Sequence, residues 1–232
     1  MQKNWEGLAR KDALWAILTT RSRGQWHVEE FFRTGEQQVN NLMVKIDTLH
    51  LPVSRKTALD FGCGVGRLTQ ALANHFESVS AVDISPTMIE LARKFNRHGE
   101  KCKFYLNETD QLPMFKDQSF DLIYSMLTLQ HMQEKYVLRY LSEFLRTLAK
   151  GGLLVFDLPS PPRLFMRLRC AVSYHLPCYH RFRFGGRSEM HGIKQAEVSE
   201  LIKKNEAIIL EVTSERRANK SWESHTYFIT KN

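Results

Sequence analysis

The fold of this chain is decided by the stretch Thr57-Ala58-Leu59-Asp60-Phe61-Gly62-Cys63-Gly64-Val65-Gly66-Arg67. A short apolar run ends there in an acid and continues into three glycines at every second position. Glycine reaches positive φ at little cost, and without a Cβ it lets a ligand approach the backbone. The spacing predicts a strand, a tight loop and the start of a helix. A tight turn without a ligand can also use glycines. The next acid along the chain is therefore needed to distinguish a ligand-binding loop from a purely structural turn.

That acid is Asp83, which ends a second apolar run, Ser78-Val79-Ser80-Ala81-Val82-Asp83, near the roughly 20-residue offset of a βαβ unit. A carboxylate at the tip of the second strand can accept hydrogen bonds from both hydroxyls of a ribose. A dinucleotide site would have a third glycine three positions after Gly64, where this chain has Arg67. The pattern therefore indicates a nucleoside ligand and disfavours a nicotinamide dinucleotide.

The Gly-x-Gly-x-Gly loop preceded by Asp60 resembles motif I of the class I S-adenosylmethionine-dependent methyltransferases. Further stretches are similar to later motifs of this family and follow in the family's order: 81–88, 107–113, 119–126 and 148–155. Two departures stand out, because Glu108-Thr109 replaces a common Asp-Ala pair and Lys150 replaces a usual proline. The resemblance covers about residues 56 to 158.

The resemblance implies S-adenosylmethionine as cofactor and assigns its contacts residue by residue. Asp83 would bind the ribose, Ile84 and Met88 would flank the adenine, and Met88 would equally suit the plain core. The hydrogen bond to the adenine amine would come from Glu108 or from Asp110. The full set of expected cofactor contacts is Asp60, Gly62, Cys63, Gly64, Gly66, Asp83, Ile84, Met88, Glu108, Thr109 and Met126.

Strands and helices alternate along the chain, which predicts an α/β fold with a doubly wound, mostly parallel sheet. The family resemblance implies that this sheet has seven strands and that the fold is the Rossmann-like fold of the methyltransferases. Helices are expected at 36–49, 67–76, 87–95, 136–149 and 195–204, with Gly35 interrupting the pattern before the first. Runs 207–213 and 225–230 predict an antiparallel closing hairpin, with a charged loop over 214–224 between them.

A chain of 232 residues suits a single domain, 1–232. We expect an N-terminal helical cap over 1–50, a cofactor-binding core over 56–158, a basic aromatic insertion over 159–190, and a closing helix and hairpin over 191–232. Residues 1–35 either pack on the sheet or form a lid over the cofactor. The N-terminus lacks the apolar run of a secretory signal and the four cysteines form no tight framework, so a cytoplasmic location is expected.

Ligands bind at the carboxyl ends of parallel strands, and His131 follows the fourth strand there. A histidine near neutral pKa can remove a proton from a hydroxyl or amine acceptor, so His131 is the candidate catalytic base. The same position also suits a structural or cofactor-proximal histidine. His191 and His225 are secondary candidates for acceptor contact, with structural roles as the alternative.

The insertion 159–190 holds six arginines and one acid, Glu189, which puts most of the net charge of +8 in this segment. Aromatic residues alternate with the arginines. The segment suits a solvated basic cap, a lid that selects an anionic or aromatic acceptor, or peripheral contact with a membrane surface or nucleic acid. Nucleic acid is not favoured, because the chain has no recognisable RNA-binding appendage. The spacing of Cys170, His175, Cys178 and His180 matches no common zinc motif, so no metal is predicted.

The sequence thus predicts an enzyme, an S-adenosylmethionine-dependent methyltransferase that acts on an oxygen or nitrogen atom of a small-molecule acceptor. Two alternatives stay open. One is a methyltransferase for RNA or for a membrane-associated, lipid-like substrate, and the other is an S-adenosylmethionine-binding protein without transfer activity.

Overall fold

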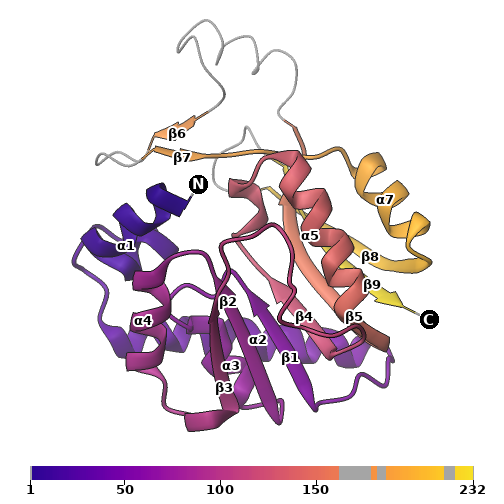
Figure 1. Ribbon diagram of the computed structural model, residues 1–232, viewed down its shortest axis with the longest axis horizontal. Coiled ribbons are helices and arrows are strands. Elements are labelled where there is room, and N and C mark those ends of the chain that lie inside the picture. The colour runs from indigo at the N-terminus through magenta and orange to yellow at the C-terminus, as the bar shows by residue number, and fades with distance from the viewer. Residues whose placement is uncertain (1, 162–178, 182–186, 217–222, 232) are drawn as a thin grey trace, which may run out of the picture.

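The computed structural model describes residues 2–161, 179–181, 187–216 and 223–231. One seven-stranded sheet forms the middle layer, in the order β3-β2-β1-β4-β5-β9-β8, with helices on both faces (Figure 1). The neighbouring strands from β3 to β5 pair in parallel, whereas β9 is antiparallel to both β5 and β8. This arrangement confirms the predicted doubly wound sheet and its closing hairpin.

The seven strands of the sheet are β1 (Thr57–Phe61), β2 (Ser78–Asp83), β3 (Cys102–Leu106), β4 (Phe120–Ser125), β5 (Leu148–Pro159), β8 (Ala207–Arg216) and β9 (Glu223–Lys231). The helices are α1 (Gln2–Ile17), α2 (Val28–Thr48), α3 (Arg67–Ala73), α4 (Pro86–Phe95), α5 (Glu134–Thr147) and α7 (Gln195–Lys204), with the short turns η1 (Gly99–Lys101) and η2 (Leu129–His131). Two short strands, β6 (Tyr179–Arg181) and β7 (Arg187–Glu189), pair with each other inside the predicted insertion.

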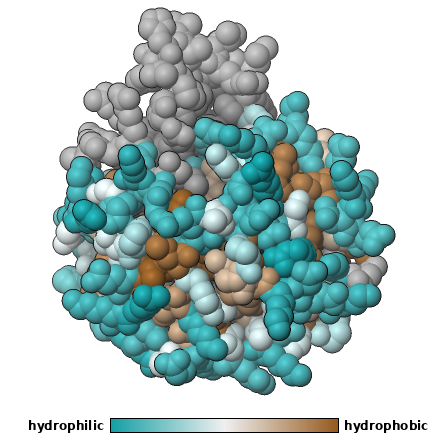
Figure 2. Space-filling model, viewed as in Figure 1, coloured by the Kyte–Doolittle hydropathy of each residue, from teal (hydrophilic) through white to brown (hydrophobic). Residues whose placement is uncertain are grey.

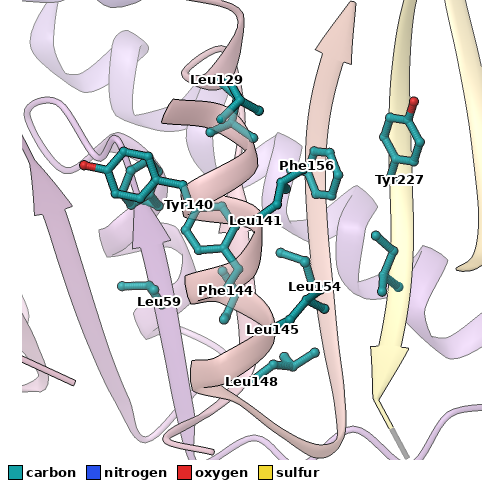
Figure 3. Packing of buried hydrophobic residues seen from close by; sticks show 14 of the residues in the cluster. Leu59, Leu129, Tyr140, Leu141, Phe144, Leu145, Leu148, Leu154, Phe156 and Tyr227 are labelled. Carbon is teal, nitrogen blue, oxygen red and sulfur yellow. The ribbon is translucent and has the colours of Figure 1, made fainter. Parts of the chain in front are cut away.

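Helix α5 buries the apolar face that its sequence predicts. Figure 3 shows Tyr140, Leu141, Phe144 and Leu145 pointing from α5 toward β1, β5 and β9. Their rings and methyl groups meet Leu59, Leu154, Phe156 and Tyr227 of the sheet. Burial of such side chains contributes roughly 1.5–3 kcal/mol each, so this layer holds the strand ends at fixed positions.

The opposite face of the sheet is covered by α2 and α3, and here the predicted start of a helix at residue 36 is wrong. Helix α2 begins at Val28 and continues through Gly35. A Cβ on Gly35 would lie 2.4 Å from the carbonyl oxygen of Arg67, so the glycine lets α2 approach the start of α3. The residue serves close packing between two helices and does not end one of them.

The predicted charged loop over 214–224 is also too long. Strand β8 continues to Arg216, and its last residues pair with the start of β9 in the register Ser214↔His225, Glu215↔Ser224 and Arg216↔Glu223. Backbone hydrogen bonds of an antiparallel ladder do not depend on apolar side chains, so the ladder runs on into the polar stretch.

After β3 the chain crosses the sheet as an irregular segment, 107–119 (Figure 1). The other connections between consecutive parallel strands each contain a helix, α3, α4 or α5. Leu112 and Phe115 from this segment are buried, while Leu106 and Met114 remain 39% and 37% exposed. Figure 2 shows this face of the molecule, with apolar side chains in its middle and a mostly hydrophilic rim. Among the described helices, none combines the length and the apolar character that a membrane span requires.

Candidate functional site

The glycine loop joins β1 to α3 at the carboxyl end of the sheet. Gly62, Gly64 and Gly66 all have positive φ, at 78°, 54° and 85°. A Cβ on Gly62 would lie 2.2 Å from the hydroxyl oxygen of Thr128, and one on Gly64 would lie 2.5 Å from Cδ1 of Ile17. Both the backbone conformation and the space at these positions therefore require glycine.

The two predicted motifs meet at Asp83, the last residue of β2. Its Oδ2 accepts a hydrogen bond from the backbone N–H of Gly64 at 2.9 Å, and its Oδ1 accepts one from Ser85 N, also at 2.9 Å. Burial raises the pKa of this carboxyl. The glycine loop and the second acid are thus in direct contact.

Asp60 lies beneath the loop and is 1% exposed. Thr69 Oγ1 donates to its Oδ2 at 2.6 Å, and burial raises the pKa of the carboxyl to about 6. The guanidinium of Arg67 opposes this increase. Arg67 is itself buried and donates to Gln38 Oε1 and Thr34 Oγ1 of α2, at 2.9 and 3.3 Å, which ties the start of α3 to the neighbouring helix.

In the segment after β3, the structure distinguishes Glu108 from Asp110, the two acids that the sequence offered as partners of the adenine amine. Asp110 forms an ion pair with Arg139 of α5, whereas the exposed Glu108 accepts a hydrogen bond from Gln2 of α1. Asn107 donates to the carbonyl oxygens of Thr109 and Gln111 at 3.3 and 2.9 Å, so it fixes the loop from inside. Glu108 is therefore left at the rim of the site and Asp110 is held away by α5.

The chain after β4 brings His131 to the same edge. Gln130 Nε2 lies 3.1 Å from His131 Nε2, and when the amide donates, the ring nitrogen is the acceptor. The indole of Trp5 meets the imidazole edge-on, with ring centroids 5.0 Å apart at 65°. Proton transfer through Nε2 would therefore require the Gln130 amide to release that nitrogen.

Helix α1 extends across this edge, so the predicted N-terminal segment lies over the site. Glu6 accepts hydrogen bonds from Ser85 Oγ at 2.6 Å, Thr87 Oγ1 at 2.6 Å and Thr87 N at 3.2 Å, all at the start of α4. The two hydroxyls are the main reason that the pKa of Glu6 is lowered to about 2. Ile17 reaches Gly64 from the other end of the helix.

The helix is bent at Asp12, where φ and ψ are −168° and 94°. The Asp12 carboxylate accepts hydrogen bonds from Trp15 N at 3.0 Å and Gly24 N at 2.8 Å. The second half of α1 is anchored by this residue, and the first half is anchored by Glu6. Two separate contacts thus hold the helix over the glycine loop.

The remaining predicted contacts lie close to the loop. Cys63 and Met88 are buried, and burial raises the pKa of the Cys63 thiol well above its usual range. Met88 packs with the apolar side of α1, which favours its interpretation as a core residue. Ile84 and Met126 are half-buried.

Of the secondary histidines, His225 is 4% exposed and lies between two serine hydroxyls, Ser160 Oγ at 2.8 Å and Ser214 Oγ at 2.9 Å. His191 donates its backbone N–H to Gln130 O at 2.7 Å, which joins the end of the insertion to η2. Most of the insertion, 162–178 and 182–186, lies outside the described residues, and so do Cys170, His175 and Cys178. Over the described part of the chain, no group of three or more His, Cys, Asp or Glu is placed to hold a metal ion.

Two site residues were missed by the sequence reasoning. Glu6 gives no local signal, because an acid on a mixed-charge helix is usually solvated. Asp157 is a buried carboxylate at the end of β5, 1% exposed, and it accepts a hydrogen bond from Leu127 N at 2.6 Å. Its presence in the apolar run Leu153-Leu154-Val155-Phe156-Asp157-Leu158 was a usable signal.

Comparison with known proteins gives a family match over the core of the chain. Residues 59–156 match the profile of the family described as methyltransferase domain. The demethylmenaquinone methyltransferase of Tropheryma whipplei is 34% identical over 121 residues, which are 51% of this chain and 49% of that protein. The ubiquinone biosynthesis O-methyltransferase of Coxiella burnetii is 31% identical over 122 residues, 51% of this chain and 50% of that protein. The chain thus spans about half the length of these curated relatives.

Solved structures extend the likeness to the whole fold. The magnesium protoporphyrin IX methyltransferase of Synechocystis, in a crystal structure with bound SAH, superposes with a TM-score of 0.67. The two sequences are 17% identical, and the match covers 100% of this chain and 98% of that one. At this level of identity the likeness establishes a shared fold.

Proposed function

We propose that this chain, whose residues 59–156 match the methyltransferase domain family, transfers a methyl group from S-adenosylmethionine to an oxygen or nitrogen atom of a small-molecule acceptor. The observation that carries the proposal is the hydrogen bond from Gly64 N to Asp83, which joins the glycine loop and the second acid into one site. A loop of glycines with positive φ, beside the buried carboxylate of Asp60 and the half-buried carboxylate of Asp83, suits a nucleoside with a charged amino-acid tail.

The residues at the loop fit the parts of this cofactor. Asp83 would accept the ribose hydroxyls, the backbone of the glycine loop together with Asp60 would hold the amino-acid end, and Glu108 would bind the adenine amine, since Asp110 is paired with Arg139. Further contacts would come from residues around the loop and the strand ends: Gly62, Cys63, Gly66, Ile84, Thr109 and Met126.

When bound, S-adenosylmethionine supplies a methyl group on a positively charged sulfur, which already activates the carbon. The protein then has to align the acceptor, exclude water and take up a proton where the acceptor is a hydroxyl or an amine. Helix α1, held by Glu6 over the loop, would exclude water. His131 is the candidate for the proton, because its ring lies at this edge between Gln130 and Trp5.

The choice of a small-molecule acceptor is supported by the names of the relatives, which are methyltransferases of demethylmenaquinone and of ubiquinone biosynthesis. A phenolic or hydroquinone acceptor would need a base, and His131 could serve as that base. A His131→Ala protein should then transfer methyl groups to a hydroxyl acceptor more slowly, by roughly 10²–10⁴-fold, with unchanged cofactor affinity. Turnover at the parental rate would assign His131 a structural role.

The decisive experiment for the cofactor is a calorimetric titration of the purified protein with S-adenosylmethionine and S-adenosylhomocysteine, with NAD and NADP as controls. We expect binding in the micromolar range for the first pair alone. Acceptor screening by mass spectrometry would follow, beginning with hydroquinones. Cofactor binding without any methylated product would favour a non-catalytic binding protein, and absence of cofactor binding would refute the proposed activity.

A further inference from the structure

The residue after the predicted cofactor contact Met126 has an unusual backbone conformation. Leu127 has a φ of +61°, in the left-handed region that side chains with a Cβ rarely adopt. The other described non-glycine residues with positive φ, His50, Gln118 and Glu206, lie in turns away from the strand ends that carry the site. Leu127 lies between β4 and η2, beside the glycine loop. A strained residue at such a place requires a local contact that holds it.

The contact is made by Asp157. Its Oδ1 accepts the backbone N–H of Leu127 at 2.6 Å, which is short for an N–H···O hydrogen bond. Asp157 is 1% exposed, at the carboxyl end of β5, the strand that pairs with β4 through Ser125↔Phe156. A buried carboxylate is costly within the apolar run 153–158, and the hydrogen bond from Leu127 N offsets part of this cost.

The turn at Leu127 determines where the following residues lie. Thr128 packs against Gly62 so closely that a Cβ on the glycine would lie 2.2 Å from its hydroxyl oxygen. Gln130 Nε2 donates to the carbonyl oxygen of Leu127 at 3.5 Å and also contacts His131. The turn therefore connects the glycine loop on one side with the His131 pair on the other.

We propose that Asp157 is a positioning residue, which holds Leu127 in the left-handed conformation and so fixes segment 126–131 against the glycine loop. The inference rests on the proposed function, because segment 126–131 would face the methyl group and the acceptor only if the chain transfers methyl groups. The hydrogen bond itself can be tested on the protein without any ligand, so the two claims can fail separately.

The test compares Asp157→Ala and Asp157→Asn, each made in the parental protein and in a Leu127→Gly protein. Glycine reaches positive φ without strain, so in a Leu127→Gly protein the left-handed conformation depends less on the hydrogen bond to Asp157. Hydrogen exchange of the amides in 127–131 and the dissociation constant for S-adenosylmethionine are measured for each variant. Asp121→Ala is the matched control, because Asp121 also accepts a backbone N–H, that of Thr57 at 2.8 Å, but at the opposite end of the sheet.

We expect Asp157→Ala to accelerate exchange in 127–131 by about tenfold and to weaken cofactor binding, with a clearly smaller effect in the Leu127→Gly background. Asp157→Asn should retain slow exchange, because its amide oxygen can still accept the N–H. Asp121→Ala should lower the melting temperature and leave exchange in 127–131 unchanged.

Equal effects of Asp157→Ala in the two backgrounds, or equal effects of the Ala and Asn changes, would overturn the proposal, since the carboxylate would then act by burial or charge alone. Unchanged exchange in Asp157→Ala would do the same. Parental protein that fails to bind S-adenosylmethionine would refute the proposed function, while the exchange comparison would still decide the role of Asp157.

Discussion

Replacement of Asp60 by asparagine should make the protein more stable and less able to bind its cofactor. Burial raises the pKa of Asp60 from 3.8 to about 6, so the folded state binds the proton more tightly than the unfolded state does. The contribution of Asp60 to folding stability is then greatest below the unfolded pKa and is lost as the pH rises through about 6. A difference of about two pKa units corresponds to about 3 kcal/mol at neutral pH, the cost of keeping this carboxylate charged inside the fold.

The asparagine side chain would keep an oxygen that can accept the Thr69 hydroxyl at the place of Oδ2, and it would carry no charge. We therefore expect Asp60→Asn to raise the free energy of unfolding at neutral pH by about 1–3 kcal/mol and to remove most of this site's contribution to the pH dependence. Cofactor affinity should fall, because the carboxylate would face the amino group of S-adenosylmethionine.

Urea unfolding of the parental and variant proteins, across the range from about pH 4 to about pH 8, measures the stability difference and its dependence on pH. Glu90→Gln is the control, since Glu90 is an exposed acid on α4 and should change neither quantity. An Asp60→Asn protein that is less stable than the parent at neutral pH would refute the reasoning. So would a stability difference that stays constant across the titration.

Three further changes test the surroundings of the loop. Asp83→Ala should weaken S-adenosylmethionine binding by about ten- to a hundredfold in calorimetry, and unchanged affinity would place the ribose elsewhere. Gly64→Val should abolish that binding with the circular dichroism of the sheet retained, because its φ is +54° and its Cβ would lie 2.5 Å from Ile17; normal binding would contradict this. Glu6→Gln should accelerate hydrogen exchange in α1 by about tenfold. The Glu6 contribution to stability is present above the unfolded value of 4.5 and is lost as the pH falls through about 2, so the variant should lack this acid transition.

The amino-acid sequence alone was sufficient for the core of the fold. Local conformation is predicted by the glycine spacing, by the acids at 60 and 83 and by the apolar period of α5. The order of the strands and helices along the chain then predicts a doubly wound sheet, which is the sheet observed. Such signals are local because backbone preference and side-chain direction depend mostly on near neighbours in the chain. The proximity of Asp83 and Gly64 could be predicted for the same reason, because both residues belong to one βαβ unit.

The tertiary structure decided what depends on distant contacts. The sequence predicted a break at Gly35 and a helix that starts at residue 36, yet α2 continues through Gly35 because Arg67 packs there. The two acids after β3 became distinguishable only when Arg139 of α5 paired with Asp110. Glu6 and Asp157 become site residues only because folding brings each of them to a partner far along the chain, a hydroxyl for one and a strained turn for the other. No local propensity encodes these contacts, because the free energy that selects them arises from burial and hydrogen bonding in the assembled fold.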